Sequence, residues 1–219
     1  MIAAIVPAKA LDQAKGRLAA LLSEPERRQL ALAMLEDVLK ALQAVPQLDL
    51  ITVVSPDREV LALAWELGAE AIAEPPSVRG INQALSHAVS VVSARHISVL
   101  LVLLADVPAV TPADITSVLD ALPPGRGVVL CPSHDKGTSA LALRPPDAIP
   151  FRFGPHSFPA HKREAAARGL HAAVLRLPSL ARDIDEPDDL CELLSRPAET
   201  ATQRLLAQLR LGERARSQS

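Results

Sequence analysis

The sequence is poor in aromatic side chains. Its 219 residues include three phenylalanines, one tryptophan and no tyrosine, and the formal net charge is only −2. Proteins that bind nucleic acids use basic surfaces to attract phosphates and aromatic rings to stack against bases. Because this chain has neither an excess of positive charge nor many rings, we expect no nucleic-acid partner.

Cysteine is also scarce, and the two thiols are Cys131 and Cys191. Neither has a neighbouring cysteine or a suitably spaced histidine pair, so the sequence indicates neither a zinc site nor a disulfide framework. We expect both side chains to be buried as small hydrophobic groups. Scarce, unpaired cysteine is typical of a protein of the reducing cytoplasm, which is where we expect this one.

Long apolar runs are absent as well. A membrane-spanning helix needs about 20 apolar residues, whereas the start MIAAIVPAK turns polar after six residues and the run VLLVLLA covers only 99–105. The start also lacks a basic leader. We therefore expect no signal peptide and no membrane partner.

Glycine-rich phosphate loops are missing too. Neither G-x-x-x-x-G-K-[ST] nor G-x-G-x-x-G occurs in the chain. This absence argues against P-loop kinases and nicotinamide dehydrogenases, whose phosphate binding depends on those loops.

What the chain does have is a regular alternation of apolar runs and helical patterns. Strands are predicted at IAAIVP, LITVVS, EAIAEP, ISVLLVLLA and GVVLCP, separated by single helices. Continuous apolar strands joined by helices are typical of a parallel sheet that is covered on both faces. We therefore predict an α/β, Rossmann-like fold with a mostly parallel central sheet and helices on both faces.

The rhythm changes after the fifth strand. TSALALRP and AAVLRLP are predicted as further strands of the same sheet, and EPDDLCELLS as a short helix. Since no linker divides the chain, we predict a single domain over residues 1–195 and a helical or frayed tail over 196–219. An exposed hydrophobic face on the final helices would favour a homodimer.

Several helix starts can be read from capping residues. Ser23 with Glu26 forms a capping-box pattern, and Thr111 followed by Pro112 is a typical N-cap and first turn. Ser157 is expected as the N-cap of the helix FPAHKREAAARG.

Polar residues gather where the predicted strands end. In open parallel sheets ligands bind outside the carboxyl ends of the strands. The residues placed there are Lys9, Lys15 and Arg17, the segment PPSVRGINQAL, Asp106, the segment PSHDKGT, and Asp183 with Asp185. Basic groups facing carboxylates across one sheet edge suggest a phosphate ligand together with Mg²⁺, which prefers carboxylate and phosphate oxygens.

Simpler interpretations compete with this one. The basic loop of Lys9, Lys15 and Arg17 could be solvated surface, Asp106 could cap a turn, and Asp188 with Asp189 could serve the helix dipole. Thr138 and Ser157 could be an ordinary strand residue and an N-cap. The stretch FGPHSF, however, places Gly154 and Ser157 at a helix start, where backbone N–H groups attract an anion.

At these residues the chain resembles a known family. The segments IVPAKALDQAKGRLA, RGINQAL, LLADVPAVTPADI, CPSHDKGTSALALRPP, FGPHSFPAHKREAAARG and RDIDEPDDL, in this order, resemble the 2-phospho-L-lactate or phosphoenolpyruvate guanylyltransferases of deazaflavin coenzyme F(420) biosynthesis. The resemblance implies a GT-A-like nucleotidyltransferase fold. It also implies an enzyme that uses GTP and Mg²⁺ to join GMP to the phosphate of a three-carbon phosphoacid, with release of pyrophosphate.

The resemblance also implies roles for individual residues. Asp106, Asp183 and Asp185 match the metal-binding carboxylates, and Thr138, Gly154 and Ser157 match the positions that hold the acceptor phosphoacid. Lys9, Lys15 and Arg17 match the loop that faces the triphosphate, and Gly80 with Asn82 match a motif near the guanosine.

The chain departs from the family pattern at three positions. Lys136 stands where DGGT has glycine, His156 where a small residue is common, and Gly16 where AKSRL has a hydroxyl. Lys136 and His156 flank the expected acceptor pocket. A donor there would favour phosphoglycerate over phosphoenolpyruvate or 2-phospho-L-lactate.

Two other functions stay open from the sequence alone. One is a nucleotidyltransferase of the same fold with a sugar-phosphate or molybdenum-cofactor acceptor, although the G-x-G-x-R loop common there is absent. The other is a sensor that binds a nucleotide without turnover. Release of pyrophosphate from GTP in the presence of a phosphoacid would separate an enzyme from a sensor.

Overall fold

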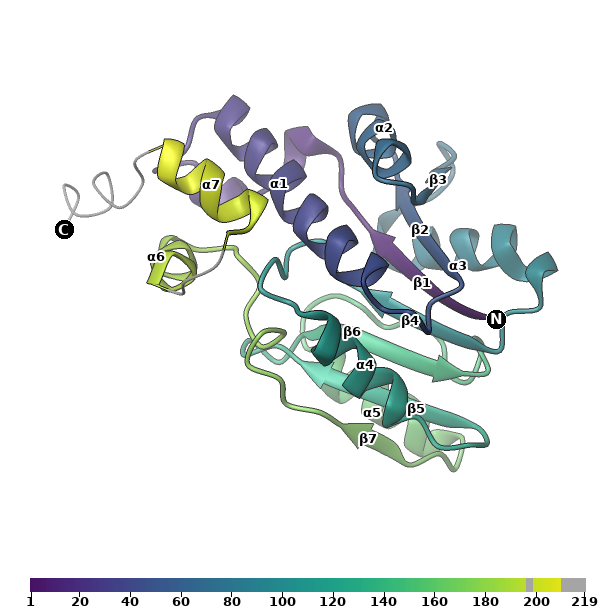
Figure 1. Cartoon of the computed structure of the whole chain (residues 1–219). Coiled ribbons are helices and arrows are strands. Elements are labelled where there is room, and N and C mark those ends of the chain that lie inside the picture. Colours follow the sequence, from purple (N-terminus) through teal and green to yellow (C-terminus); the bar gives the residue numbers. More distant parts are fainter. Residues whose placement is uncertain (196–198, 210–219) are drawn as a thin grey trace.

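The computed structural model describes residues 1–195 and 199–209 of the chain. Seven strands form one mixed sheet in the order β3-β2-β1-β4-β6-β5-β7 (Figure 1). The strands are β1 (Ile2–Pro7), β2 (Leu50–Ser55), β3 (Glu70–Ala73), β4 (Val99–Leu103), β5 (Gly127–Pro132), β6 (Thr138–Arg144) and β7 (Ala172–Val174). The prediction of a mostly parallel central sheet is confirmed.

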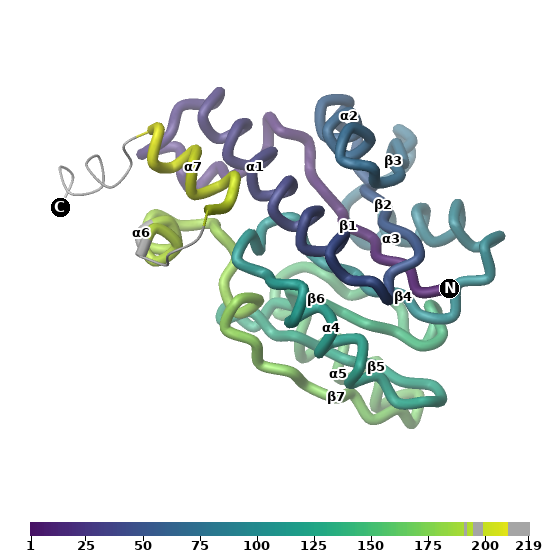
Figure 2. Tube along the Cα trace, viewed as in Figure 1, coloured from purple at the N-terminus to yellow at the C-terminus, as the bar shows by residue number. Residues whose placement is uncertain are grey.

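Helices alternate with strands from β1 to β5, whereas β6 follows β5 directly and two helices follow β7 (Figure 2). The helices are α1 (Glu24–Gln43), α2 (Arg58–Glu66), α3 (Gly80–Val92), α4 (Pro112–Asp120), α5 (Ser157–Ala167), α6 (Pro187–Ser195) and α7 (Ala201–Gln208), with 3-10 turns η1 (Leu11–Gln13), η2 (Gly16–Leu18) and η3 (Ser93–Arg95). No helix among the described residues is long and apolar enough to cross a membrane.

Alternate side chains of the central strands enter two separate cores. In β4, Leu101 and Leu103 belong to the core under α1, α2 and α4, whereas Leu100 and Val102 belong to the core under α3 and α5. This alternation explains why the strand reads as one continuous apolar run, since both of its faces are buried. The helix layers on the two faces confirm the predicted architecture (Figure 1).

β6 runs antiparallel to both of its neighbours, β4 and β5. Its first residue, Thr138, therefore lies at the edge where the parallel strands have their carboxyl ends, opposite Pro132 at the end of β5. The sequence predicted the strand but not its direction. The reversal places a strand start, rather than a strand end, at the edge that binds ligands in such sheets.

A third hydrophobic cluster joins the C-terminal helices to α1. Leu190 and Leu193 of α6 and Leu206 of α7 are buried against Leu30 and Met34 of α1. The hydrophobic side chains that led us to expect a homodimer thus pack within the chain. The homodimer itself stays a prediction. Residues 196–198 and 210–219 of the expected tail lie outside the described residues.

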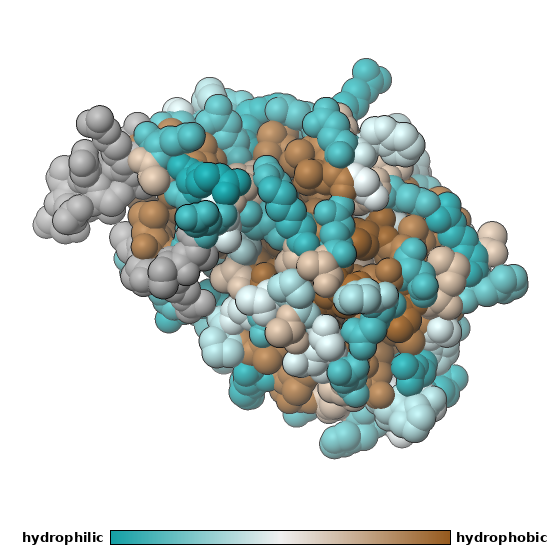
Figure 3. Space-filling model, in the orientation of Figure 1, coloured by the Kyte–Doolittle hydropathy of each residue, from teal (hydrophilic) through white to brown (hydrophobic). Residues whose placement is uncertain are grey.

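Local predictions were confirmed in part. Ser23 and Thr111 are the N-caps of α1 and α4, and the carboxylates three residues further on accept hydrogen bonds from their backbone N–H groups. Cys131 is buried, which raises the pKa of its thiol to about 12, while the side chain of Cys191 lies outside the described residues. Hydrophilic side chains cover much of the face that carries α1 and α7, with small hydrophobic areas between them (Figure 3).

Candidate active site

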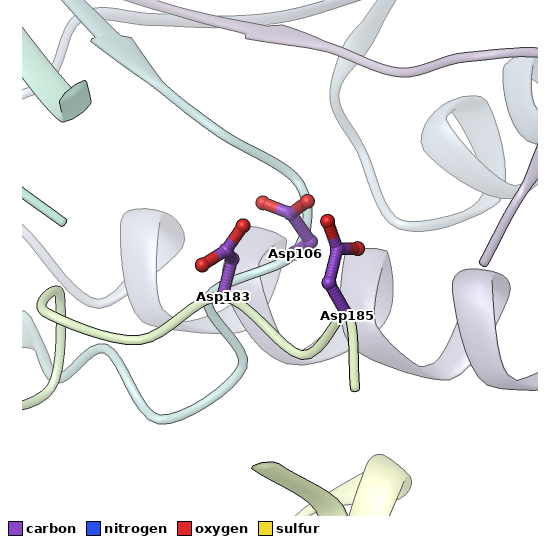
Figure 4. A group of neighbouring side chains, drawn as sticks. All are labelled: Asp106, Asp183 and Asp185. Atoms are coloured by element: carbon purple, nitrogen blue, oxygen red, sulfur yellow. The ribbon is translucent and has the colours of Figure 1, made fainter. Parts of the chain in front are cut away.

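Three carboxylates from distant parts of the chain meet at the edge where the parallel strands end. Asp106 follows β4, and Asp183 and Asp185 lie on the segment before α6; one oxygen from each lies within 4.8 Å of the others. Figure 4 shows the three carboxylate groups side by side, extending from their loops in the same direction. The expectation that these residues come together is confirmed.

The backbone around the carboxylates fixes their positions. The N–H of Ile184 donates to the Asp106 carbonyl oxygen at 3.1 Å, and the Ile184 side chain is buried. The Asp189 carboxylate accepts from the N–H groups of Asp185 and Glu186 at 3.1 and 2.8 Å. Because Ile184 points into the core, the residues on either side of it turn toward Asp106.

Lys15 is the counter-ion of the cluster. Its ammonium lies 3.0 Å from Oδ2 of Asp106 and 2.8 Å from Oδ1 of Asp185, and its side chain is only 8% exposed. Burial opposes the charged form of Lys15, but the attraction of Asp106 and Asp185 is stronger in sum and raises the pKa of the ammonium. Lys15 therefore stays positively charged between these two carboxylates.

The two carboxylates of the C-terminal pair differ in charge environment. Burial and the repulsion of Asp106 and Asp185 raise the pKa of Asp183 to about 6. Burial acts in the same direction on Asp185, but Lys15 outweighs it and holds the pKa of Asp185 below its usual value. The three carboxylates outnumber the lysine that pairs with them, and Asp183 is the one that takes up a proton first as the pH falls.

The donor set suits a divalent cation. Oδ1 of Asp106 is buried and has no hydrogen-bond partner within the described part of the chain. A buried carboxylate oxygen without a donor is costly, and a metal ion bound between the three carboxylates would satisfy it. Hard cations such as Mg²⁺ prefer such oxygen ligands, so the residues fit the expected metal.

The other two predicted basic residues lie at the margin of the cluster. Lys9 and Arg17 are exposed, and their charges contribute to the lowered pKa of Asp185. The Arg17 guanidinium approaches the Glu186 carboxylate at 3.6 Å, with a side chain that is 71% exposed. Both cations are therefore available to an anionic ligand, whereas Lys15 is already engaged by carboxylates.

A pair of buried hydroxyls forms a second part of the site. Ser157 Oγ donates to Thr138 Oγ1 at 3.2 Å, and both residues are almost fully buried. The prediction that Ser157 is an N-cap was wrong. His156 is the N-cap, with φ 57°, and Ser157 is the first residue of α5. Its hydroxyl bonds to Thr138 rather than to a backbone N–H of its own helix.

The loops beside the hydroxyl pair have left-handed backbones. Gly154 has φ 128°, Lys136 has φ 70° and His156 has φ 57°. The last two are therefore at positions that favour glycine or small polar residues, and both side chains are exposed. The Lys136 carbonyl accepts from the Phe158 N–H at 3.1 Å, so the two loops are tied together.

Asn82 and Gly80 lie at the start of α3. Gly80 has φ 74° and begins the helix. The Asn82 amide donates to the Phe153 carbonyl at 2.9 Å and accepts from the Phe153 N–H at 2.8 Å. Its side chain therefore holds the loop that leads to Gly154, which is a contact that the sequence did not predict.

The hydroxyl pair and the carboxylates are linked through one loop. The His134 N–H donates to the Ala181 carbonyl at 2.7 Å, two residues before Asp183. The same loop, residues 133–137, leads directly into Thr138. The two halves of the site therefore share a backbone connection.

The sequence interpretation placed Lys15 at the site but did not predict its two ion pairs, which have no local sequence signal. It missed one residue altogether, His161, whose Nδ1 lies 3.1 Å from Thr138 Oγ1. Its spacing of four residues from Ser157 was a usable signal, because such residues share one face of a helix.

Comparison with known proteins agrees with this geometry. Residues 2–219 match the family model described as "Guanylyl transferase CofC like". A phosphoenolpyruvate guanylyltransferase of Sphaerobacter thermophilus is 47% identical over 191 residues, covering 87% of this chain and 91% of the relative. A protein of the same name from Roseiflexus castenholzii is 41% identical over 213 residues and covers 97% of both chains.

Solved structures of low sequence identity share the fold. A protein assigned as a nucleotide-diphospho-sugar transferase from Desulfovibrio desulfuricans G20 aligns with a TM-score of 0.79 at 15% identity, covering 99% of this chain and 97% of that one. A nucleotidyl transferase from Methanothermobacter thermautotroptrophicus aligns with a TM-score of 0.68 at 17% identity, covering 88% and 95%. With the family match over nearly its whole length, the chain belongs to the CofC-like guanylyl transferases and is a nucleotidyltransferase.

Proposed function

We propose that this guanylyltransferase joins GMP from GTP to the phosphate of a three-carbon phosphoacid, releases pyrophosphate, and serves coenzyme F(420) biosynthesis. The observation that carries the proposal is the placement of the carboxylate cluster and the Thr138–Ser157 pair at one sheet edge, connected by residues 133–137. The names of the relatives support phosphoenolpyruvate as the acceptor.

Each group has a task in this reaction. Asp106, Asp183 and Asp185 would hold Mg²⁺, which neutralises charge on the triphosphate and the leaving pyrophosphate when bound. Lys9 and Arg17 would face the triphosphate from the margin of the site, and Lys15 would hold the Asp106 and Asp185 carboxylates in place beside it. Gly80 and Asn82, at the start of α3, are the residues we assign to the guanosine side.

The acceptor would be held by backbone and hydroxyl groups. The Thr138–Ser157 hydroxyl pair would donate one proton to it, and the first turn of α5 presents N–H groups beside Gly154. The acceptor phosphate has its second pKa at about 6 and is an anionic nucleophile at neutral pH. No general base is therefore needed, and the protein's work is to align two anions that repel each other.

Pyrophosphate release from GTP with Mg²⁺ and phosphoenolpyruvate tests the proposal. We expect Asp106→Asn to lose turnover and to weaken binding of GTP with Mg²⁺. Asp188→Asn is the matched control, because Asp188 is an exposed carboxylate on the first turn of α6 outside the cluster. Unchanged turnover in Asp106→Asn would remove this residue from the metal site.

A second acceptor is favoured by two residues. Lys136 and His156 place cationic or donor side chains beside the hydroxyl pair, where they would contact the extra hydroxyl of 3-phospho-D-glycerate. Competing phosphoenolpyruvate, 2-phospho-L-lactate and 3-phospho-D-glycerate at equal concentration decides between them. A strong preference for phosphoenolpyruvate would contradict the role of Lys136 and His156.

A further inference from the structure

His161 is a buried histidine directly behind the hydroxyl pair. It lies on α5, one turn after Ser157, and is fully buried. Its ring packs against Phe153 with centroids 4.9 Å apart and the planes at 71°. Both ring nitrogens have polar partners, so the side chain is held in one orientation.

The partners of His161 determine its tautomer. The backbone N–H of Arg152 lies 2.9 Å from Nε2, and because a backbone N–H can only donate, Nε2 must accept. The proton of the neutral ring is then on Nδ1, which faces Thr138 Oγ1 at 3.1 Å. Burial keeps the ring neutral by lowering its pKa to about 4, with Glu164 opposing and Arg152 reinforcing this shift.

The tautomer in turn decides where the hydroxyl protons go. With Nδ1–H donating, Thr138 Oγ1 is an acceptor for the ring and need not give its own proton to it. The Thr138 and Ser157 hydroxyls carry two protons, and one of them joins the two oxygens at 3.2 Å. The other proton is therefore left to donate away from the ring. With the opposite tautomer, Nδ1 would take the Thr138 proton.

We propose that His161 is a positioning residue for the acceptor: its Nδ1–H holds Thr138 Oγ1 so that one hydroxyl proton of the Thr138–Ser157 pair points at the acceptor's phosphate. This inference rests on the proposed function, in which that pair binds the acceptor. His161 is fully buried, so its role is exerted through Thr138.

Two substitutions separate the functions of the two ring nitrogens. His161→Asn keeps an N–H donor near the position of Nδ1, whereas His161→Gln keeps an acceptor near the position of Nε2. We expect His161→Gln to raise the KM for phosphoenolpyruvate about tenfold, the effect of one lost hydrogen bond. His161→Asn should stay within about threefold of the wild type. The kcat and the KM for GTP should change little in either variant.

A double-mutant cycle with Thr138→Val tests whether His161 acts through Thr138. In the Thr138→Val background, His161→Gln should add no further rise in the KM for phosphoenolpyruvate, because interacting residues are not additive. A merely structural role of His161 would instead add to the effect of Thr138→Val. Additive effects, or equal effects of the Asn and Gln variants, would overturn the inference.

A measurement on the wild-type protein tests the tautomer of His161 directly. Long-range ¹H–¹⁵N correlation spectra of histidine-labelled protein should show His161 as the Nδ1–H tautomer, with His161→Asn used for assignment. An Nε2–H tautomer or a doubly protonated ring at neutral pH would overturn the inference. If Thr138→Val alone leaves the KM for phosphoenolpyruvate unchanged, the proposed acceptor site fails instead, and the two failures are distinguishable.

Discussion

Replacing Asp183 by asparagine should stabilise the metal-free protein while abolishing its response to Mg²⁺. Asp183 contributes one of three carboxylate oxygens that lie within 4.8 Å of one another, and Lys15 forms ion pairs with Asp106 and Asp185. Two like charges at that separation repel by about 3 kcal/mol at an effective dielectric constant of about 20. Asparagine removes the charge and keeps the shape.

The pKa of Asp183 leads to the same sign. Folding raises the pKa of the Asp183 carboxyl from 3.8 to about 6. The folded protein therefore loses stability as the pH rises through that range. The full shift corresponds to about 3 kcal/mol. Since Asp183 is partly exposed, solvent screening reduces this value, and we expect Asp183→Asn to gain about 1–2 kcal/mol at about pH 7.5.

Urea unfolding in the presence of a chelator, followed at several pH values, measures this gain. The difference between variant and wild type should shrink as the pH falls from 6 toward 3.8, where the wild-type carboxyl becomes protonated. Mg²⁺ with GTP should raise the Tm of the wild type but not that of Asp183→Asn. Asp188→Asn is the control and should keep the Mg²⁺ response.

Two results would refute this reasoning. If Asp183→Asn has a lower free energy of unfolding than the wild type in the presence of the chelator at about pH 7.5, repulsion between the carboxylates does not dominate the stability of the cluster. If the variant keeps the full Mg²⁺-dependent rise in Tm, Asp183 is not a ligand.

Two further predictions concern stability. Asp37→Ala should lower the free energy of unfolding, measured in urea, by about 2–3 kcal/mol. The reason is that the buried Asp37 carboxylate accepts hydrogen bonds from the N–H groups of Ala201 and Thr202 at 2.7 and 2.9 Å. A loss no larger than that caused by Glu36→Gln would contradict this prediction. Folding lowers the pKa of His161 from 6.5 to about 4. The stability that the neutral ring contributes should therefore be fully present above pH 6.5 and be lost as the pH falls toward 4. As the pH is lowered through that window, the difference in unfolding free energy between the wild type and His161→Asn should fall by up to about 3 kcal/mol. A difference that does not change with pH would show that the ring does not titrate as described.

Much of the fold could be predicted because its signals are local. Thr111 and Pro112 predict the start of α4, and the apolar run before Asp106 predicts a strand that is buried on both faces. The carboxylate cluster could be predicted too, since Asp106 and the Asp183–Asp185 pair follow from strand ends that share one edge of the sheet.

The rest depended on tertiary contacts that leave no pattern in the chain. Lys15 reaches Asp106 and Asp185 from a left-handed backbone position with φ 53°. Sequence patterns do not predict a lysine in that conformation. The reversed direction of β6 depends on pairing with both β4 and β5. The hydrogen bonds of the Asn82 amide to the Phe153 backbone likewise have no signal in the sequence.

The Lys15 contacts also bear on how the enzyme matures. They join residues that are 91 and 170 positions apart in the sequence. Contacts of such long range form late, because the chain entropy of closing the loops must first be overcome. During synthesis, the first strands can pair before residue 185 has left the ribosome, but the lysine and its two carboxylates cannot meet. A nascent or C-terminally truncated chain would therefore lack the complete carboxylate cluster, so the proposed site forms only when the fold is complete.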